Sequence, residues 1–431
     1  MKIFYRLLCA GLCLAPALSY SQSREDSLAR HFLDLNQAGN FDQAAAMFNS
    51  NLRAKVSPDM LKQVWMQLDS QFGPYLGILS NTSKHTDSLI IIMSSCHFEN
   101  ADLTLSFAFN KADQLAGYRV TGVKPLKTGL QEDSSRYRQE PSTLHTVSGN
   151  ISGTLMLPSG KNRVPVALII AGSGPTDRDG NNTMGEISDC YKLLAEGLAG
   201  NGIASLRYDK RGIGASALAM TDEKKLSLND YISDAEGWVN QLKQDSRFTG
   251  VVIIGHSEGS LIGMMAAHKS PAEAFISLSG PGMDLESILL IQLKGQLNDT
   301  LYKKAAHILQ SLSKGKTTKQ VPASLSSLFN PEVQPYLISE IRLDPAKEIA
   351  KLKIPVLIVQ GDNDLQITTG DARRLAQADP RATLIIMHHM THMLKDAAST
   401  RQDNLKTYSD PSLPLDPALI PDITEFIRAI H

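Results

Sequence analysis

A serine between two glycines follows a run of apolar residues and is the strongest chemical signal in the chain. Ser257 is the centre of the pentapeptide GHSEG, which is preceded by four β-branched residues at 251–254 and followed by a helix-like run at 261–268. In a nucleophile elbow a strand turns sharply into a helix, and the residues two before and two after the serine must be small. Gly255 and Gly259 meet this requirement, so we predict that Ser257 is a nucleophile.

A serine nucleophile needs a base, and the base needs a carboxylate that orients it. The segment QGDND follows the strand-like run at 356–359, and Asp364 lies three residues beyond Gly361. Asp364 is therefore expected on the loop at the carboxyl end of a strand, where the orienting acid of such a site belongs. Asp362 is the competing candidate, but a residue so close to the strand end more often helps to shape the turn.

Three histidines follow the last strand-like run, at 383–387, in the segment HHMTH. The base must reach back over the sheet from a loop beyond the strand, and His392 satisfies this best. His388 and His389 are still at the strand end, and we interpret them as pocket-lining or surface residues. The resulting chain order of serine, aspartate and histidine is the order that an α/β-hydrolase sheet requires.

Acyl transfer also needs two hydrogen-bond donors for the oxyanion. The backbone N–H of Glu258 is one candidate, because it begins the helix after the nucleophile and the helix dipole there favours negative charge. The second donor is expected from the glycine-rich segment at 171–175, which follows the apolar run at 164–170. Ser173 is our choice for this backbone N–H, and an ordinary strand–helix turn is the alternative.

Two charge clusters beside glycines, DRD at 177–179 and DKR at 209–211, raise the question of a metal or phosphate site. Acids and bases that alternate in this way neutralise each other and leave few carboxylates for a cation. We interpret the clusters as salt bridges that brace the oxyanion loop. No zinc-type Cys/His spacing occurs in the sequence, and we expect neither a metal nor another cofactor.

Apolar strand-like runs alternate with helical segments through the second part of the chain. Continuous apolar strands of this kind predict a mostly parallel sheet that is covered on both faces, hence an α/β fold. An alternating hairpin at 143–147 and 151–157 leads into this sheet, as in the α/β-hydrolase fold, and a helix-rich insert at 284–350 is predicted to form a cap above the nucleophile. The predicted strands are 164–170, 203–207, 251–254, 274–278, 356–359 and 383–387.

The 431 residues are enough for two domains. Residues 24–123 read as helices followed by strands at 89–93, 103–109 and 115–120, which predicts a small α+β module. A polar segment at 124–142 is the predicted linker, and the hydrolase domain is expected over 143–431.

Composition limits the function further. The hydrophobic content is 42%, the charged content is 20% and the formal net charge is −1, so nothing indicates a nucleic-acid partner. Residues 1–21 resemble a secretory signal peptide, with Lys2 and Arg6 before an apolar run at 7–18. About a dozen apolar residues are too few to span a bilayer. We therefore expect export to the periplasm or the medium, without stable membrane insertion.

Only two cysteines, Cys96 and Cys190, follow the signal segment, and they fall in different predicted domains. Two free buried thiols are favoured over an interdomain disulfide.

Three segments together resemble a family of bacterial α/β-hydrolase esterases, close to the serine-aminopeptidase-like branch. They are AGSGPTDRDGN at 171–181, RYDKRGIGAS at 207–216 and GHSEG around the serine. The resemblance spans about 143–431 and implies a Ser257–Asp364–His392 triad that hydrolyses carboxylic esters. The leading module is similar to the small cystatin-like or nuclear-transport-factor-like domains often found before such hydrolases. The His388-His389 pair lengthens the usual run before the catalytic histidine.

The expected function is therefore that of a serine esterase that cleaves small-molecule carboxylic esters with short acyl chains through an acyl-enzyme. An exopeptidase or amidase with the same triad is the nearer alternative, with Asp284 and Glu286 as acidic anchors for a substrate amine. A binding protein that acts through its N-terminal module is the second alternative. The sequence does not reveal the oligomeric state.

Overall fold

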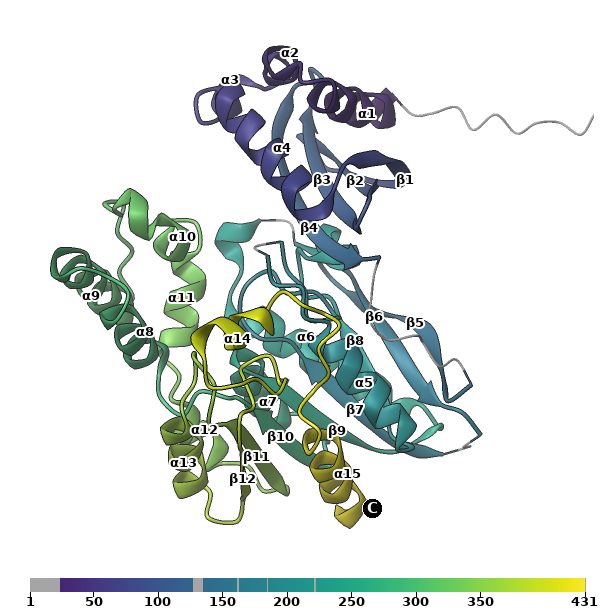
Figure 1. The fold of residues 1–431 in the computed structure, drawn as a ribbon, viewed down its shortest axis with the longest axis vertical. Helices are drawn as coiled ribbons and strands as arrows, with labels where there is room; N and C mark the ends of the chain where they lie inside the picture. Colours follow the sequence, from purple (N-terminus) through teal and green to yellow (C-terminus); the bar gives the residue numbers. More distant parts are fainter. Residues whose placement is uncertain (1–23, 127–134, 161–162, 184, 221, 431) are drawn as a thin grey trace, which may run out of the picture.

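A computed structural model describes residues 24–126, 135–160, 163–183, 185–220 and 222–430 (Figure 1). The expected signal peptide lies outside the described residues, as does the middle of the expected linker. Figure 1 shows a small module at the top, in purple and blue, above a larger body built around a second sheet.

The small module is α+β, as predicted, with its helices before its strands. Four antiparallel strands in the order β1-β2-β3-β4 form its sheet. The module has its own core, in which aromatic side chains of helices and strands meet, among them Phe32, Phe48 and Phe107. Its elements are α1 (Arg24–Gln37), α2 (Phe41–Ala46), α3 (Ser50–Arg53), α4 (Pro58–Phe72), β1 (Tyr75–His85), β2 (Leu89–Phe98), β3 (Ala101–Asn110) and β4 (Leu115–Pro125).

Strand β1 was not predicted from the sequence. It is an edge strand whose second half is largely polar and exposed, and its register shifts near Gly77. An alternating apolar pattern is therefore missing where a half-buried strand would show one.

The larger sheet has eight strands in the order β12-β11-β10-β9-β7-β8-β6-β5. The hairpin of β5 and β6 is antiparallel and joins β8 in antiparallel fashion, whereas the other pairings are parallel. The strands are β5 (Tyr137–Thr146), β6 (Gly149–Pro158), β7 (Val164–Ile170), β8 (Ala204–Tyr208), β9 (Phe248–His256), β10 (Ala274–Leu278), β11 (Val356–Gly361) and β12 (Thr383–Met387). The mostly parallel α/β sheet and its leading hairpin are confirmed.

Two apolar cores lie on the two faces of this sheet, because its central strands are buried on both sides. Trp238 and Leu261 belong to one core, and Leu194 and Ile423 to the other. The covering helices are α5 (Cys190–Gly200) and α15 (Leu419–Ile430) on one face, and α6 (Leu228–Gln244), α7 (Glu258–Ala267), α12 (Pro345–Ile349) and α13 (Thr369–Ala378) on the other. The short helices η1 (Gly214–Ala219), η2 (Glu223–Lys225) and α14 (Arg401–Lys406) lie in connecting segments.

The expected cap is a helical insert between β10 and β11. It has a small core of its own that includes Leu309, Phe329 and Ile341. Figure 1 shows its helices, in green, beside the sheet and below the small module. They are α8 (Leu285–Lys294), α9 (Asp299–Ser313), η3 (Ala323–Leu325), α10 (Ser326–Phe329) and α11 (Gln334–Ile341).

The expected linker at 124–142 is partly strand. Strand β4 extends to Pro125, and β5 begins at Tyr137, before the expected domain start at 143. Residues 137–142 of this stretch belong to β5, an edge strand of the large sheet, where one exposed face allows a polar pattern.

The small module rests on the segment that follows β8. The Lys84 ammonium donates hydrogen bonds to the carbonyls of Leu218, at 2.8 Å, and Ser148, at 3.4 Å. Gly122 of β4 packs closely on Gly214, because a Cβ added to Gly122 would lie 3.2 Å from the Cα of Gly214. The two modules are therefore in direct contact.

In the described part of the chain, no helix combines the length and the apolar character needed to cross a bilayer. Cys96 and Cys190 are both free and buried, as expected.

Candidate active site

Ser257 lies at a strained turn between β9 and α7. Its backbone has φ +54° and ψ −126°, a conformation that L residues rarely adopt and that marks functional sites when the surroundings impose it. The flanking glycines are required by close packing. A Cβ on Gly255 would lie 2.2 Å from the carbonyl oxygen of Gly259, and one on Gly259 would lie 2.3 Å from that of Ile170. The predicted elbow therefore has the geometry that lifts a serine out of a sheet.

Asp364 and His392 form a buried pair on the loops after β11 and β12. The distance from His392 Nδ1 to Asp364 Oδ2 is 2.8 Å, and their side chains are 3% and 0% exposed. The other carboxylate oxygen accepts the backbone N–H groups of Gln366, at 2.8 Å, and Ile367, at 3.0 Å. Burial opposes ionisation, but the electrostatic interaction and hydrogen bond with His392 and these backbone hydrogen bonds hold the pKa of Asp364 below its usual value.

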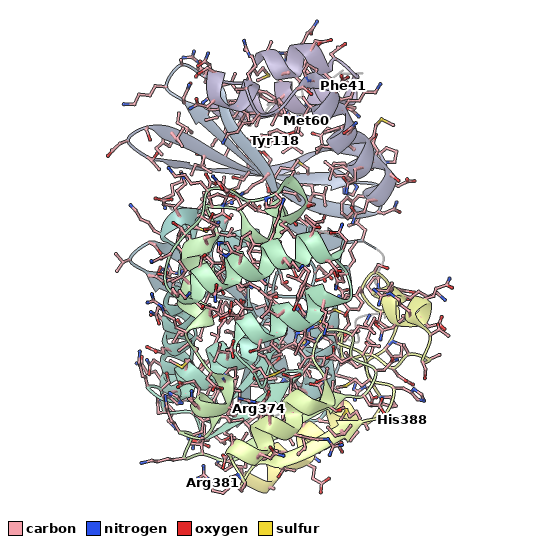
Figure 2. All side chains as sticks on the ribbon, turned by 90° about the vertical axis from the view of Figure 1, so that its left-hand side faces the viewer. Phe41, Met60, Tyr118, Arg374, Arg381 and His388 are labelled. Carbon is pink, nitrogen blue, oxygen red and sulfur yellow. The ribbon has the colours of Figure 1, made fainter. Side chains whose placement is uncertain are left out.

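The competing residues form a separate pair at the surface. His388 Nδ1 lies 2.7 Å from Asp362 Oδ2, and the His388 side chain is 75% exposed. The backbone N–H of His389 donates to the same carboxylate, so Asp362 shapes the turn, as expected of the residue nearer the strand. Figure 2 shows His388 at the periphery of the molecule.

The glycine-rich loop after β7 lies against the nucleophile. A Cβ on Gly172 would be 3.1 Å from the Ser257 Cβ. The N–H of Gly172 donates to the Tyr191 hydroxyl at 3.0 Å, and its carbonyl accepts from Lys210 at 2.5 Å. The next N–H, that of Ser173, donates to none of the described residues, so it remains available for an oxyanion.

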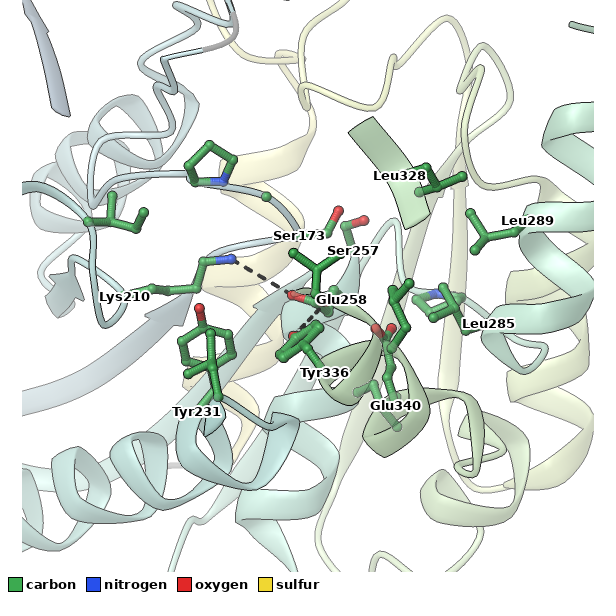
Figure 3. A pocket seen from close by; sticks show the side chains of 18 of the residues that line it. Ser173, Lys210, Tyr231, Ser257, Glu258, Leu285, Leu289, Leu328, Tyr336 and Glu340 are labelled. Carbon is green, nitrogen blue, oxygen red and sulfur yellow. Dashed lines mark hydrogen bonds and ion pairs between the residues drawn. The ribbon is translucent and has the colours of Figure 1, made fainter. Parts of the chain in front are cut away.

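A cavity of about 540 Å³ opens beside Ser257. Most of its wall is apolar, and Figure 3 shows residues of the glycine-rich loop, the elbow and the cap around it. The small module also contributes to the wall. The cap contributes Leu285, Leu289, Leu328 and Tyr336, and the small module contributes Arg119, Val120 and Thr121.

Parts of this chain are similar to known protein families and to known esterases. Residues 182–334 match the family described as serine aminopeptidase S33, and residues 29–118 match a family of unknown function. Esterase EstD of Thermotoga maritima is 26% identical over 335 residues, which cover 77% of this chain and 78% of the relative. The solved structure of Est1E from Butyrivibrio proteoclasticus is 18% identical, with 67% of this chain and 99% of Est1E covered and a TM-score of 0.43. An esterase structure from Pyrococcus furiosus is 14% identical, with 70% and 93% covered and a TM-score of 0.45.

The mostly parallel sheet, with a strained serine where its fifth strand along the chain meets the following helix, has the arrangement of the α/β-hydrolase fold. The larger body therefore has an α/β-hydrolase fold.

A hydrogen-bonded relay that the sequence did not predict connects the glycine-rich loop after β7 to the loop of His392. The Tyr191 hydroxyl lies 2.7 Å from His256 Nδ1, and His256 Nε2 lies 2.8 Å from the carbonyl oxygen of His392. A carbonyl only accepts, so Nε2 carries the proton and Nδ1 accepts from Tyr191. Burial, and then the charge of His392, lowers the pKa of His256 to about 3. His256 is therefore a neutral support for both loops.

A buried ionic cluster, also missed, lies in the cavity wall of the hydrolase. Lys210 is 2% exposed, and its ammonium lies 3.8 Å from Glu258 Oε2, while the Tyr336 hydroxyl donates to Glu258 Oε1 at 2.8 Å. Figure 3 shows these contacts converging on Glu258. Burial and the nearby charge of Glu258 raise the pKa of Glu340 well above its usual value, which disfavours the charged form of this carboxyl. The sequence alone predicts a role only for the backbone N–H of Glu258.

The charge clusters at 177–179 and 209–211 brace the oxyanion loop, as predicted. Arg178 forms a double hydrogen bond with Asp209, at 3.0 and 2.7 Å, and Arg207 pairs with Asp179 at 2.7 Å. Lys210 alone of these clusters points its charge at the nucleophile region. Across the described ranges, no group of three or more His, Cys, Asp or Glu side chains has the arrangement to hold a metal ion.

Proposed function

We propose that this protein is a serine hydrolase that cleaves carboxylic esters of short acyl chains through Ser257, His392 and Asp364. The observation that carries the proposal is the buried Asp364–His392 pair beside a strained serine elbow at the wall of an apolar cavity. The similarity to esterase EstD supports the same reaction class. The chain is a carboxylic ester hydrolase that needs no cofactor for this chemistry.

The mechanism follows from the roles of the three side chains. His392, oriented by Asp364, takes the proton from Ser257 as the serine oxygen attacks the ester carbonyl. The N–H groups of Glu258 and Ser173 stabilise the oxyanion, and His392 then protonates the leaving alcohol. Water repeats the cycle on the acyl-enzyme and releases the acid.

The substrate class follows from the cavity. A volume of about 540 Å³ falls within the usual range for small-molecule sites. The cap leucines provide an apolar wall for an acyl chain, and a cavity of this size suits a short chain. A small-molecule ester is therefore the proposed partner.

A peptidase would need a free carboxylate to bind a substrate amine. Asp284 caps α8 by accepting from Ser287, and neither Asp284 nor Glu286 lines the cavity. The acidic side chains on the described wall are compensated. Glu258 faces Lys210 and Tyr336, and Glu223 pairs with Arg119 at 3.7 Å. Burial raises the pKa of Glu340 and so disfavours its charged form. Ester hydrolysis is therefore favoured over the aminopeptidase activity named for the matching family.

Export is part of the proposal. The basic and apolar pattern of residues 1–21 supports a signal peptide, which would direct the hydrolase to the periplasm or the medium. Comparing the N-terminus of the mature protein in cell fractions with the encoded sequence tests this.

Initial rates on p-nitrophenyl esters from acetate to decanoate, and on aminoacyl p-nitroanilides, test the activity, with Ser257→Ala as the control. We expect turnover of the shorter esters, no turnover by Ser257→Ala, and labelling of Ser257 by a fluorophosphonate. Turnover of the anilides alone would favour a peptidase. Absence of both activities, together with absence of labelling, would overturn the proposal and favour a binding protein.

A further inference from the structure

Lys210 is a buried lysine in the wall of the cavity beside Ser257. Lys210 lies just after β8, and its ammonium donates to the Gly172 carbonyl at 2.5 Å and lies 5.3 Å from the centre of the Tyr231 ring. Removing an ammonium from water costs several kcal/mol, so a buried lysine indicates a specific task when its partners are few. Burial lowers the pKa of Lys210, and the negative charge of Glu258 opposes this.

Lys210 contacts the carbonyl of the peptide unit whose N–H is the proposed oxyanion donor. The C=O of Gly172 and the N–H of Ser173 are the two ends of one planar amide. A hydrogen bond to the oxygen of an amide fixes its plane and polarises its N–H, which strengthens the bond that this N–H donates. The charge of Lys210 therefore acts on the N–H that we assign to the oxyanion.

The other partner of Lys210 belongs to the second oxyanion donor. Glu258 supplies the helix N–H next to the nucleophile, and its carboxylate lies 3.8 Å from the Lys210 ammonium. Tyr336 of the cap holds the other oxygen of this carboxylate at 2.8 Å. One ion pair thus joins the two segments that carry the two donors.

We propose that the Lys210–Glu258 ion pair is a positioning device for the oxyanion hole: Lys210 fixes and polarises the Gly172–Ser173 peptide, and Glu258 holds Lys210 in place. The side chains of Lys210 and Glu258 act by positioning other groups, since neither side chain needs to touch the reacting atoms. This inference rests on the proposed esterase function.

The test compares Lys210→Met and Glu258→Gln with the wild type and with Glu348→Gln. Glu348 is also a buried carboxylate in an ion pair, with Lys351 at 2.8 Å, but it does not line the cavity. For each variant, kcat and KM on p-nitrophenyl butyrate are measured together with the inhibition constant of an alkyl trifluoromethyl ketone, whose serine adduct carries an oxyanion. Thermal unfolding of each variant is recorded as well.

Removing an oxyanion donor outright costs roughly 10²–10³ in kcat. Because Lys210→Met weakens a donor and leaves it in place, we expect a kcat roughly tenfold to a hundredfold lower, KM within about threefold, and a ketone affinity reduced by the same factor as kcat. Glu258→Gln keeps Lys210 and should show a smaller loss in the same direction. Glu348→Gln should leave all three kinetic quantities unchanged.

Two results would overturn the inference. The first is a Lys210→Met protein, folded and labelled by fluorophosphonate, whose kcat and ketone affinity stay within threefold of the wild type. The second is a loss of kcat without a matching loss of ketone affinity, as a merely structural lysine would give. If Lys210→Met does not fold, Glu258→Gln decides by the same criteria. A wild type without esterase turnover instead contradicts the proposed function itself.

Discussion

Replacing Asp364 by asparagine tests whether Asp364, and not Asp362, orients the proposed base. The change exchanges one carboxylate oxygen for an NH₂ group. Oδ1 of Asp364 accepts the N–H groups of Gln366 and Ile367, at 2.8 and 3.0 Å. In Asp364→Asn only the amide oxygen can accept these bonds, so the amide NH₂ must take the Oδ2 position, 2.8 Å from His392 Nδ1. A donor there forces Nδ1 to accept, and the ring proton moves to Nε2. His392 then cannot take the proton of Ser257.

The magnitude follows from the wrong tautomer. An equivalent change in a serine–histidine–aspartate triad costs about 10⁴ in kcat, which corresponds to about 5.5 kcal/mol. The new NH₂ also faces the Gln360 side-chain nitrogen, which donates to Oδ2 at 3.0 Å, so we expect a loss of stability of about 1–3 kcal/mol from the mismatched donors.

The matched control is Asp362→Asn, which changes the same group two positions earlier. Its partner His388 is exposed, and exposed ion pairs contribute about 1 kcal/mol or less. We expect kcat/KM on p-nitrophenyl butyrate within twofold of the wild type. The measurements are kcat from pH 6 to 9 and the thermal midpoint of each variant. A kcat within tenfold of the wild type for Asp364→Asn, or an equal loss for Asp362→Asn, refutes the assignment.

Three further changes test other parts of the structure. His256 is buried and neutral, with a pKa of about 3 in the folded protein against 6.5 in the unfolded chain. As the pH falls below 6.5, only the unfolded state gains a proton at this residue, so the folded protein loses stability. From pH 8 to pH 5 this loss should be about 2 kcal/mol larger in the wild type than in His256→Gln, as measured by urea unfolding; equal losses would contradict the buried neutral histidine. Gly259→Ala places a methyl group 2.3 Å from a backbone oxygen and should cost about 3 kcal/mol or more by the same method, whereas Gly295→Ala, with nothing within 4 Å of the added carbon, should be close to neutral. Arg119→Ala removes a side chain from the cavity wall and should raise kcat/KM for octanoate relative to acetate by roughly threefold. Arg138→Ala, which removes an exposed arginine outside the cavity, serves as its control, and an equal change in both variants would argue against a wall role.

The sequence was sufficient where one local pattern carries the information. Ser257 needs only a strand, two small residues and a helix, and β7, β10 and β12 begin and end where the apolar runs do. The positions of Asp364 and His392 could be predicted as well, because each residue lies just beyond such a strand. In the structure the two side chains are paired, with His392 Nδ1 2.8 Å from Asp364 Oδ2.

The sequence was not sufficient where contacts join distant segments. The bond between Tyr191 and His256 spans 65 positions, and neither residue carries a local signal for it. The contact of Tyr336 with Glu258 exists because the cap folds back on the sheet, and periodicity shows a helix without showing its neighbour. Strand β1 was missed because edge strands with an exposed, polar half have no alternating pattern.

The shared cavity also links the energetics of the two modules. Arg119, Val120 and Thr121 reach the wall from β4 of the small module, so any ligand that contacts them stabilises both modules and the contact between them. Occupancy of the site should then merge the unfolding of the two modules into one transition. A fragment that begins at 143 would lose this linkage together with half of β5, and its acyl preference would describe a different binding site.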